Sequence, residues 1–401
     1  METVEITVDD LLLRPWRPTD ADAVWRACQD PVLRRWSLGL PVPYPREAAR
    51  AFVEDEAPRR LADGTGLHLG IFDAADGLLG SVGLHGMRPD ADTAELGYWS
   101  APEARGRRVT ERASRALLRH GFERLGLRRV DWKATVGNHA SRLTGLRLGV
   151  QLIGVLPEDV RGRDGTPVDR WVGSLRAGDL TAAGTDVPDR VRRRARLFGG
   201  PQPVLHGAGG VRLRPLAERD LSAVTAACRD PESVRWTTVP EPYTDADSIW
   251  FATRHAPAVW AAGTGAVFAV TGPDDAYAGS MDLRISPADP AVADVGFLVA
   301  PQARGRGYAT AALRTLAVWG LRDVALERVE WKAHVANAAS RRVAEKAGFT
   351  IEGVQRAAVP HRGERRDCHV GALLPADLEP AELGQGGSAG QGGSAGQGGS
   401  A

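Results

Sequence analysis

Hydrophobic positions in the second half of the chain follow two periods. Apolar runs of strand length occur at 211–215, 266–271, 279–285, 295–299, 328–335, 351–357 and 368–374. Apolar residues three to four positions apart predict helices after Asp220 and at 244–259, 309–320 and 338–346. The order β-α-α-β-β-β-α-β-α-β-β predicts an α/β (α+β) domain with a mixed sheet and helices packed on it.

The first half of the chain carries the same pattern. The tripeptide Leu-Arg-Pro at 13–15 recurs at 213–215, and Trp-Lys-Ala at 132–134 recurs at 331–333, at offsets of 200 and 199. Solenoid repeats have periods of about 20–50 residues, so an offset this long indicates two copies of one domain.

The repeat sets the expected domain boundaries. We expect an N-terminal domain at 1–182 and a C-terminal domain at 209–380, joined by a linker at 183–208. The linker holds a basic run at 191–196 in which no aromatic residue interleaves, which favours a solvated linker over a nucleic-acid site. Residues 381–401 are rich in Gly, Ser and Gln and predict a flexible tail.

Composition narrows the class of protein. The net charge of +1 gives no global basic field, so we expect neither nucleic acid nor membrane as partner. Three widely spaced cysteines without a Cys-x-x-Cys pair indicate neither a disulfide framework nor a zinc site. No apolar run reaches the roughly 18 residues of a membrane span, and no signal peptide precedes the first strand. We expect a cytoplasmic monomer or homodimer.

A glycine-containing basic turn, from Gln302 to Gly307, joins the apolar run at 295–299 to the next helix. The first N–H groups of a helix lack internal partners and carry the positive end of its dipole. Gly305 and Gly307 have no Cβ, so a phosphate group can approach the backbone there. The alternative is an ordinary glycine-rich turn with solvated arginines. No Gly-Lys-Ser/Thr follows, which excludes a Walker A loop.

The pattern Gln-x-x-Gly-x-Gly at 302–307, between a strand and a helix, resembles the acetyl-CoA pyrophosphate loop of the GNAT (Gcn5-related) N-acetyltransferases. The pattern Asn337-x-x-Ser340, which follows Trp-Lys-Ala at 331–333, looks like the RimJ/RimL branch of that family. The resemblance implies two tandem GNAT-like domains, each a mixed, centrally splayed sheet flanked by helices.

The same resemblance, over 8–181 and 209–379, implies an activity. It implies transfer of an acetyl group from acetyl-CoA to a primary amine, of a protein N-terminus or a small molecule, by direct attack in a ternary complex. Two alternatives stay open: a non-catalytic acyl-CoA-binding sensor or interaction module, and an acyltransferase that uses another acyl-CoA. The nine histidines show no metal-ligand spacing, so we expect no metal.

The resemblance also assigns cofactor-binding residues to the second copy. The loop backbone holds the pyrophosphate, and a strand N–H near Leu298 or Val299 polarises the thioester carbonyl. The implied set is Leu298, Val299, Gln302, Ala303, Arg304, Gly305, Arg306, Gly307, Tyr308, Ala309 and Asn337.

Three residues are implied as catalytic. Ser340 matches the serine that protonates the leaving thiolate in related enzymes, with local helix capping as the alternative. Asn337 contacts the cofactor arm or orders a water, and its alternative is a helix N-cap. The general base is assigned to Asp294, at the start of the central strand. The competing candidates are Asp282, Glu330 and His334.

The first copy departs from the loop pattern. Arg108 stands where the second copy has Gly307, and Val109 stands where it has Tyr308. A side chain there obstructs the pyrophosphate and disfavours a positive φ. The alternative is that the Arg108 guanidinium itself binds a phosphate. We predict that the first copy binds acetyl-CoA poorly and serves as a scaffold or substrate wall. The acceptor itself is not readable from the sequence, and Trp236 and Tyr243 are interpreted as packing residues rather than a substrate platform.

Overall fold

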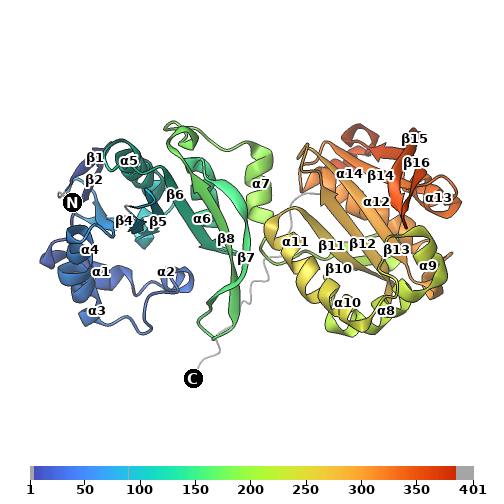
Figure 1. Ribbon diagram of the computed structural model, residues 1–401, viewed down its shortest axis with the longest axis horizontal. Helices are drawn as coiled ribbons and strands as arrows, with labels where there is room; N and C mark the ends of the chain where they lie inside the picture. The colour runs from blue at the N-terminus through green and yellow to red at the C-terminus, as the bar shows by residue number, and fades with distance from the viewer. Residues whose placement is uncertain (1–3, 89, 385–401) are drawn as a thin grey trace, which may run out of the picture. The chain divides into compact units, whose positions relative to one another are not determined.

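The computed structural model describes residues 4–88 and 90–384. The chain divides into two compact units between Gly200 and Pro201, and each unit holds one eight-stranded sheet with its helices (Figure 1). Most of the predicted tail, 385–401, lies outside the described residues. The first four residues of the predicted tail, 381–384, belong to the short helix α14, which begins at Pro380.

The second domain follows the predicted order of elements. Its strands are β9 (Leu205–His206), β10 (Arg212–Arg214), β11 (Gly265–Thr271), β12 (Tyr277–Ile285), β13 (Val292–Val299), β14 (Arg328–His334), β15 (Thr350–His361) and β16 (Glu364–Leu373). Its helices are α8 (Leu221–Arg229), α9 (Pro231–Trp236), α10 (Asp245–Trp250), α11 (Ala256–Ala262), α12 (Tyr308–Arg322), α13 (Ala338–Lys346) and α14 (Pro380–Gly384). A π-helical turn at Phe251–His255 joins α10 to α11, so the helix predicted at 244–259 is one interrupted helix.

The first domain repeats this arrangement. Its strands are β1 (Ile6–Val8), β2 (Leu11–Arg14), β3 (Leu67–Phe72), β4 (Leu78–Arg88), β5 (Thr93–Ser100), β6 (Arg129–Thr135), β7 (Gln151–Arg161) and β8 (Pro167–Leu175). Its helices are α1 (Ala21–Ala27), α2 (Pro31–Trp36), α3 (Arg46–Ala51), α4 (Ala57–Ala62), α5 (Val109–Glu123), α6 (His139–Leu148) and α7 (Asp189–Leu197).

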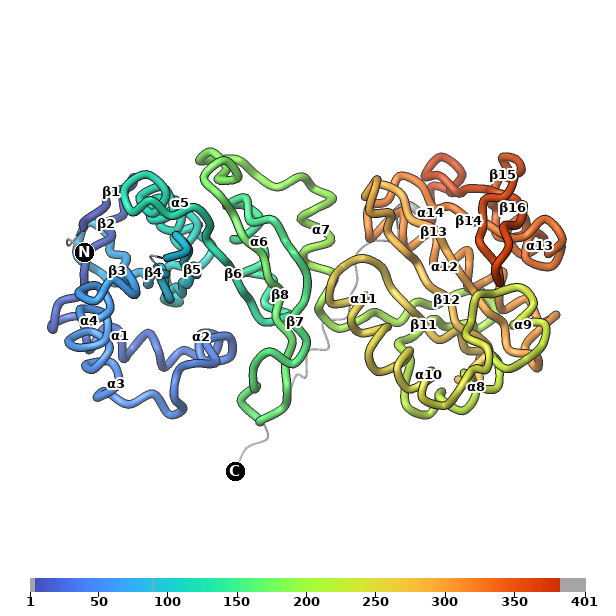
Figure 2. Tube along the Cα trace, in the orientation of Figure 1, coloured from blue at the N-terminus to red at the C-terminus, as the bar shows by residue number. Residues whose placement is uncertain are grey.

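The predicted linker at 183–208 differs from the structure. Residues 189–197 form α7, which packs on the first domain with Ala195 and Phe198 buried (Figure 2). His139 Nδ1 bonds the Ala195 carbonyl at 2.8 Å, and Arg142 donates to the Phe198 carbonyl at 3.0 Å. At the other end, β9 pairs with β10 of the second sheet. The first domain therefore extends beyond the predicted residue 182.

Asp220 does not cap α8 with its side chain. Its carboxylate accepts a hydrogen bond from the Ala217 N–H at 2.8 Å. It also forms a buried ion pair with Arg214 at 2.7 Å. Arg14 and Asp20 form the same buried pair in the first domain, at 2.8 Å. The carboxylate therefore fixes the turn that leads from the first long strand into the first helix.

The two central strands of the second sheet separate at one end. The parallel pairing of β13 with β14 runs from Val292 opposite Arg328 to Val295 opposite Trp331, and no further pair forms, although both strands continue. In the first domain β5 and β6 part in the same way after Leu96 opposite Trp132. The expected central splay is therefore present in both domains.

Candidate functional site

A cavity of about 970 Å³ lies in the second domain. Its wall includes α12 and α13 residues such as Thr310 and Val343, and α8 residues such as Val224. These helices cover opposite faces of the sheet. Leu283 of β12 lies 3.4 Å from where a Cβ on Gly320 of α12 would be, while its neighbour Asp282 points the other way, into the cavity. The cavity therefore passes through the sheet where β13 and β14 separate.

Most of the predicted site residues line this cavity. They are Leu298, Val299, Ala303, Arg304, Gly305, Gly307, Tyr308, Ala309, Asn337 and Ser340. Among the described residues that form the wall, the predicted Gln302, Arg306 and Asp294 do not occur.

The turn before α12 forms the cradle that its glycines predict. Gly305 and Gly307 have φ of +76° and +80°, and nothing lies within 4 Å of the Cβ position at either residue. The first backbone bond into α12 comes from Ala311, whose N–H donates to the Gly307 carbonyl at 3.1 Å. The N–H groups of the preceding first turn are left for an anion at the positive end of a 15-residue helix.

The polar side chains of this turn serve the fold instead. Arg304 forms an ion pair with Asp230, the N-cap of α9, and this pair lowers the pKa of the Asp230 carboxyl. Arg306 lies over the Tyr308 ring, 4.9 Å from its centroid. Gln302 donates to the Tyr277 carbonyl at 3.4 Å. The anion site of the turn is therefore made by backbone N–H groups.

Two cations that the sequence analysis did not single out lie in the wall near this turn. Arg342 and Lys346 line the cavity from α13, one helical turn apart. Within the described part of the chain neither forms an ion pair, so both are available to a phosphate. Their spacing of four residues, on the helix that starts beside Ser340, was a signal in the sequence.

The strand backbone supplies a donor within the splay. The Ala300 N–H donates to the Ala278 carbonyl of the preceding β12 region at 2.9 Å. Backbone groups of successive strand residues point in opposite directions. The N–H of Val299 therefore points away from β12, into the gap left by β14, whereas that of Leu298 faces β12.

Asn337 and Ser340 meet at the start of α13. The Asn337 Oδ1 accepts from the Ser340 N–H at 3.0 Å, so Asn337 is the N-cap of this helix and also lines the cavity. The Ser340 Oγ accepts a hydrogen bond from Trp331 Nε1 at 3.1 Å. That bond uses an oxygen lone pair and leaves the hydroxyl hydrogen of Ser340 free to donate into the cavity.

Three carboxylates line the cavity, those of Glu232, Asp247 and Asp282, and Asp282 is the one on the central strands of the sheet. Burial raises its pKa to about 6, and the neighbouring Asp294 adds to the rise while Arg284 opposes it. Arg284 of β12 forms an ion pair with Asp282 on the same strand at 2.7 Å and another with Asp294 on the neighbouring β13. Gly296 makes room for them, because a Cβ there would lie 2.7 Å from an Asp282 oxygen. Asp294 and Glu330, two sequence candidates for the base, lie outside the wall.

The far end of the cavity is aromatic. His334 packs edge to face against Trp236 and His361, with ring centroids 6.1 and 4.6 Å apart, and all three line the wall. Burial, then the nearby His361 and Arg366, lower the pKa of His334, so its ring is neutral at pH 7. His361 is 9% exposed, and its Nδ1 has no hydrogen-bond partner among the described residues. Trp236 is thus part of the wall as well as of the packing.

An arginine that sequence reasoning missed ties the β15–β16 hairpin to α9 and the segment after it. Arg362, at the tip of the β15–β16 hairpin, donates to the Val234 carbonyl at 3.0 Å and pairs with Glu241 at 2.7 Å. In the first domain, Arg163 bonds the carbonyls after α2 in the same way, including that of Ser37 at 2.7 Å. The recurrence of this arginine at an offset of 199 was the available signal.

Among the described residues, no group of three or more His, Cys, Asp or Glu side chains is arranged to hold a metal ion. No helix in the described part of the chain is long and apolar enough to cross a membrane.

Comparison with known proteins gives consistent matches. The acetyltransferase (GNAT) domain family matches the chain twice, over residues 10–151 and 211–350. YdaF of Bacillus subtilis (strain 168), named provisionally as a ribosomal N-acetyltransferase, is 32% identical over 138 residues, which are 34% of this chain and 71% of YdaF. YoaA of the same organism, an uncharacterized N-acetyltransferase, is 28% identical over 172 residues, 42% of this chain and 95% of YoaA. A crystal structure of a probable acetyltransferase is 26% identical, covers 44% of this chain and 99% of its own, and has a TM-score of 0.41.

Proposed function

Because the chain belongs to the acetyltransferase (GNAT) family and carries its domain twice, we propose that the second domain holds the working site of an acetyl-CoA-dependent N-acetyltransferase. The observation that carries the proposal is the cavity through the splayed sheet. It joins the glycine cradle at Gly307 on one side to Asp282 on the other.

The cofactor end of the cavity suits acetyl-CoA. The free N–H groups at the start of α12 donate to the diphosphate, and the open Cβ positions of Gly305 and Gly307 leave room for it. Arg342 and Lys346 supply positive charge for further phosphate oxygens. The pantetheine arm then lies in the gap between β13 and β14, where its amides complete the pairing that the strands leave open.

The reacting atoms meet in the middle of the cavity. Asp282, with a pKa of about 6, is ionised at pH 7 and accepts a proton from the incoming ammonium group. The neutral amine attacks the thioester carbonyl carbon, and the Val299 N–H donates to the carbonyl oxygen as it becomes negative. The carbon–sulfur bond then breaks, the Ser340 hydroxyl gives its proton to the departing thiolate, and the proton that the nitrogen loses as the amide forms returns to the Ser340 oxygen. The Trp331 N–H supports that serine by donating to its oxygen.

The acceptor is an amine that presents an uncharged group to the rings of Trp236, His334 and His361. Relatives named for ribosomal proteins, such as the ribosomal-protein-serine acetyltransferase of Escherichia coli (34% identical over 83 residues), favour a protein N-terminus. A small-molecule amine is the second candidate. The loop reads only the CoA part, so another acyl-CoA is a further candidate donor.

A thiol-release assay on the full chain tests the proposal. Acetyl-CoA and succinyl-CoA are offered with N-terminal peptides and with small primary amines, and products are weighed by mass spectrometry. We expect acetyl transfer to one acceptor class, lost in S340A and D282N. Transfer to the same acceptor by a G307R chain would refute a working site in the second domain.

A further inference from the structure

The first domain keeps the backbone of the anion site. Arg108, the N-cap of α5, has φ of +53°, the left-handed conformation that Gly307 has before α12. The helix that follows has 15 residues, as in the second domain. The place where the two domains differ is therefore the set of side chains around this turn.

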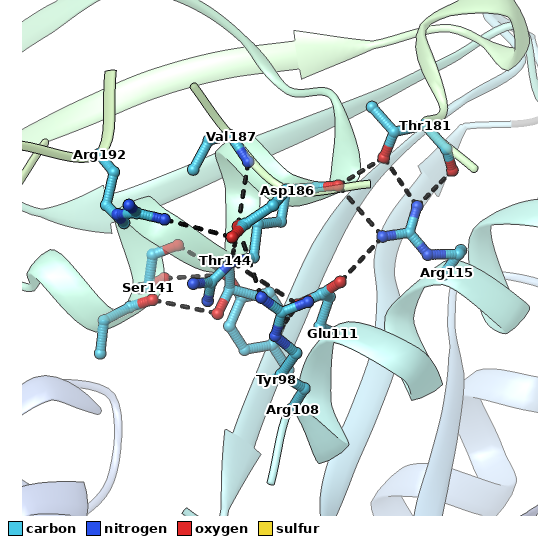
Figure 3. Close-up of polar contacts among 12 residues, drawn as sticks. Tyr98, Arg108, Glu111, Arg115, Ser141, Thr144, Thr181, Asp186, Val187 and Arg192 are labelled. Carbon is cyan, nitrogen blue, oxygen red and sulfur yellow. Dashed lines mark hydrogen bonds and ion pairs between the residues drawn. The ribbon is translucent and has the colours of Figure 1, made fainter. Parts of the chain in front are cut away.

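Asp186 brings a carboxylate to this place. Its side chain contacts three guanidinium groups, those of Arg108 and Arg147 at 3.4 Å each and that of Arg192 at 3.2 Å (Figure 3). It also accepts from the Val187 N–H at 3.1 Å. Burial raises the pKa of the Asp186 carboxyl, but Arg147, the Val187 N–H and Arg108 outweigh it and lower the pKa, so the carboxyl is ionised at neutral pH.

Glu111 brings a second carboxylate from within α5. It is 4% exposed and forms an ion pair with Arg115 at 3.0 Å. Its other oxygen, Oε2, lies 3.7 Å from Arg108 and 3.9 Å from Arg147. That oxygen is buried without a hydrogen bond among the described residues. Two carboxylates therefore face the same arginines (Figure 3).

The segment that carries Asp186 is held against the domain. Arg115 donates to the Thr181 hydroxyl at 2.8 Å, and that hydroxyl donates to the Arg147 carbonyl. Arg115 also donates to the Arg147 carbonyl at 3.1 Å. Asp186 is thus delivered by a chain segment that is fixed on both α5 and α6.

Among its described residues, the second domain has no carboxylate in the cavity wall at the positions that match Arg108, Glu111 and Arg147. Gly307 and Thr310 stand at the offsets of Arg108 and Glu111, and Lys346 stands at that of Arg147. All three line the cavity. The turn that is open to a ligand in the second domain is therefore surrounded by the carboxylates of Glu111 and Asp186 in the first domain.

We propose that Asp186 and Glu111 are internal ligands of the first domain's anion site, and that their carboxylates take the place of a phosphate group of acetyl-CoA. The inference rests on the proposed function, because that function defines the phosphate position in the second domain. The first domain is held out of cofactor binding by its own negative charge as well as by the Arg108 side chain.

Calorimetry of the full chain tests this, with CoA and inorganic diphosphate as separate probes. The second site is first silenced with G307R. On that background R108G, E111T and D186N together open the first site. The control combines R108G with E123Q and D189N, which remove two negative charges from α5 and α7 without facing residue 108. We expect the opened chain to bind CoA at least about tenfold more tightly than the control chain.

Equal binding by a folded opened chain and the control would overturn the inference. If E111T impairs folding, D186N alone decides, because Asp186 is 43% exposed: diphosphate must bind more tightly than to D189N. Retention of wild-type CoA binding by G307R alone would instead count against the proposed function. In that case the opened chain without G307R must show one additional CoA per chain for the inference to stand.

Discussion

The two domains share a backbone plan and differ at the few positions that decide whether a ligand fits. Each has a splayed pair of central strands followed by a left-handed turn and a 15-residue helix. In the second domain the turn ends in Gly307 and opens on a cavity. In the first domain it ends in Arg108, beside Glu111 and Asp186. We therefore expect cofactor binding to depend on the space that the side chains leave open as well as on the fold.

The acceptor sides differ in the same way. Asp282 lies opposite Gly296 in the second sheet, and the matching place opposite Gly97 in the first sheet is Gly83. His85 fills the space over Gly97, where its Nε2 lies 1.9 Å from a Cβ position. The first domain has thus exchanged a cavity-facing carboxylate for a packed imidazole.

The reacting centre differs by one hydroxyl group. In the second domain Trp331 donates directly to Ser340 at 3.1 Å. In the first, the Tyr98 hydroxyl accepts from Trp132 at 3.0 Å and contacts Ser141 Oγ at 3.1 Å (Figure 3). Phe297, at the position of Tyr98, leaves that place open. Ser141, the counterpart of the serine that we propose as proton donor, is thus bonded to a tyrosine hydroxyl in the first domain.

The largest expected effect comes from giving the second domain the arginine of the first. G307R should lower kcat/KM for acetyl-CoA by about 10³-fold, because a side chain then occupies the cradle. Arg108 shows that this turn accepts an arginine, so the loss should come without unfolding. Steady-state thiol release measures it, with R108G as the matched control that leaves turnover unchanged. A decrease in kcat/KM of less than tenfold would contradict the claim that the residue at this position decides which domain binds acetyl-CoA.

Removal of the base follows. D282N should lower kcat by about 10²-fold and abolish the rise of activity with pH through about 6, since the ionised carboxylate is the active form. The pH–rate profile measures both effects. D294N is the matched control, because that carboxylate lies outside the cavity. A greater loss in D294N than in D282N would return the assignment to Asp294.

Acid should weaken the first domain more than the second. Burial lowers the pKa of His68 to about 3, and the nearby His85 and Arg60 contribute. In the unfolded chain the His68 imidazole takes up a proton near pH 6.5, whereas in the folded domain it stays neutral until near pH 3. Its contribution to the free energy of unfolding is therefore fully present above pH 6.5 and is lost as the pH falls below that value. We expect a loss of about 2 kcal/mol between pH 7 and 5. Hydrogen exchange of β3 measures it, and H68V, which installs the residue found at Val267, should reduce the loss. Other histidines of this domain whose pKa is lowered, among them His85, account for the remainder. An unchanged pH dependence in H68V would contradict this account.

The smallest effect concerns the first domain's hydroxyl. Y98F should destabilise that domain by about 1 kcal/mol, the usual cost of a lost buried hydrogen bond. The second domain shows the arrangement open to the variant, a direct bond from the tryptophan to the serine. Urea unfolding measures the change. A loss several times larger would mean that the hydroxyl supports more of the first domain than its bonds to Trp132 and to the hydroxyl and carbonyl of Ser141.

The fold was predictable because its hydrophobic periods are local properties of the chain. The cradle was predictable because only glycine combines positive φ with an open Cβ position, as at Gly307. The raised pKa of Asp282 could not be predicted because it depends on burial opposite Gly296, across a strand pair. The ion pair of Arg304 could not be predicted because its partner, Asp230, lies far away in sequence.

The boundary of the first domain was misjudged for a related reason. The many arginines of α7 indicated a solvated linker, and the burial of Ala195 and Phe198 against α6 became visible only in three dimensions. The same holds for Asp186, whose partners Arg108 and Arg147 come from two other helical regions.

The central claim is that one domain binds the cofactor and the other does not. The most direct test is the number of acetyl-CoA molecules bound per full-length chain, measured by calorimetry. The account predicts one molecule per chain, and none in G307R. Two molecules per chain, or one that persists in G307R, would contradict it.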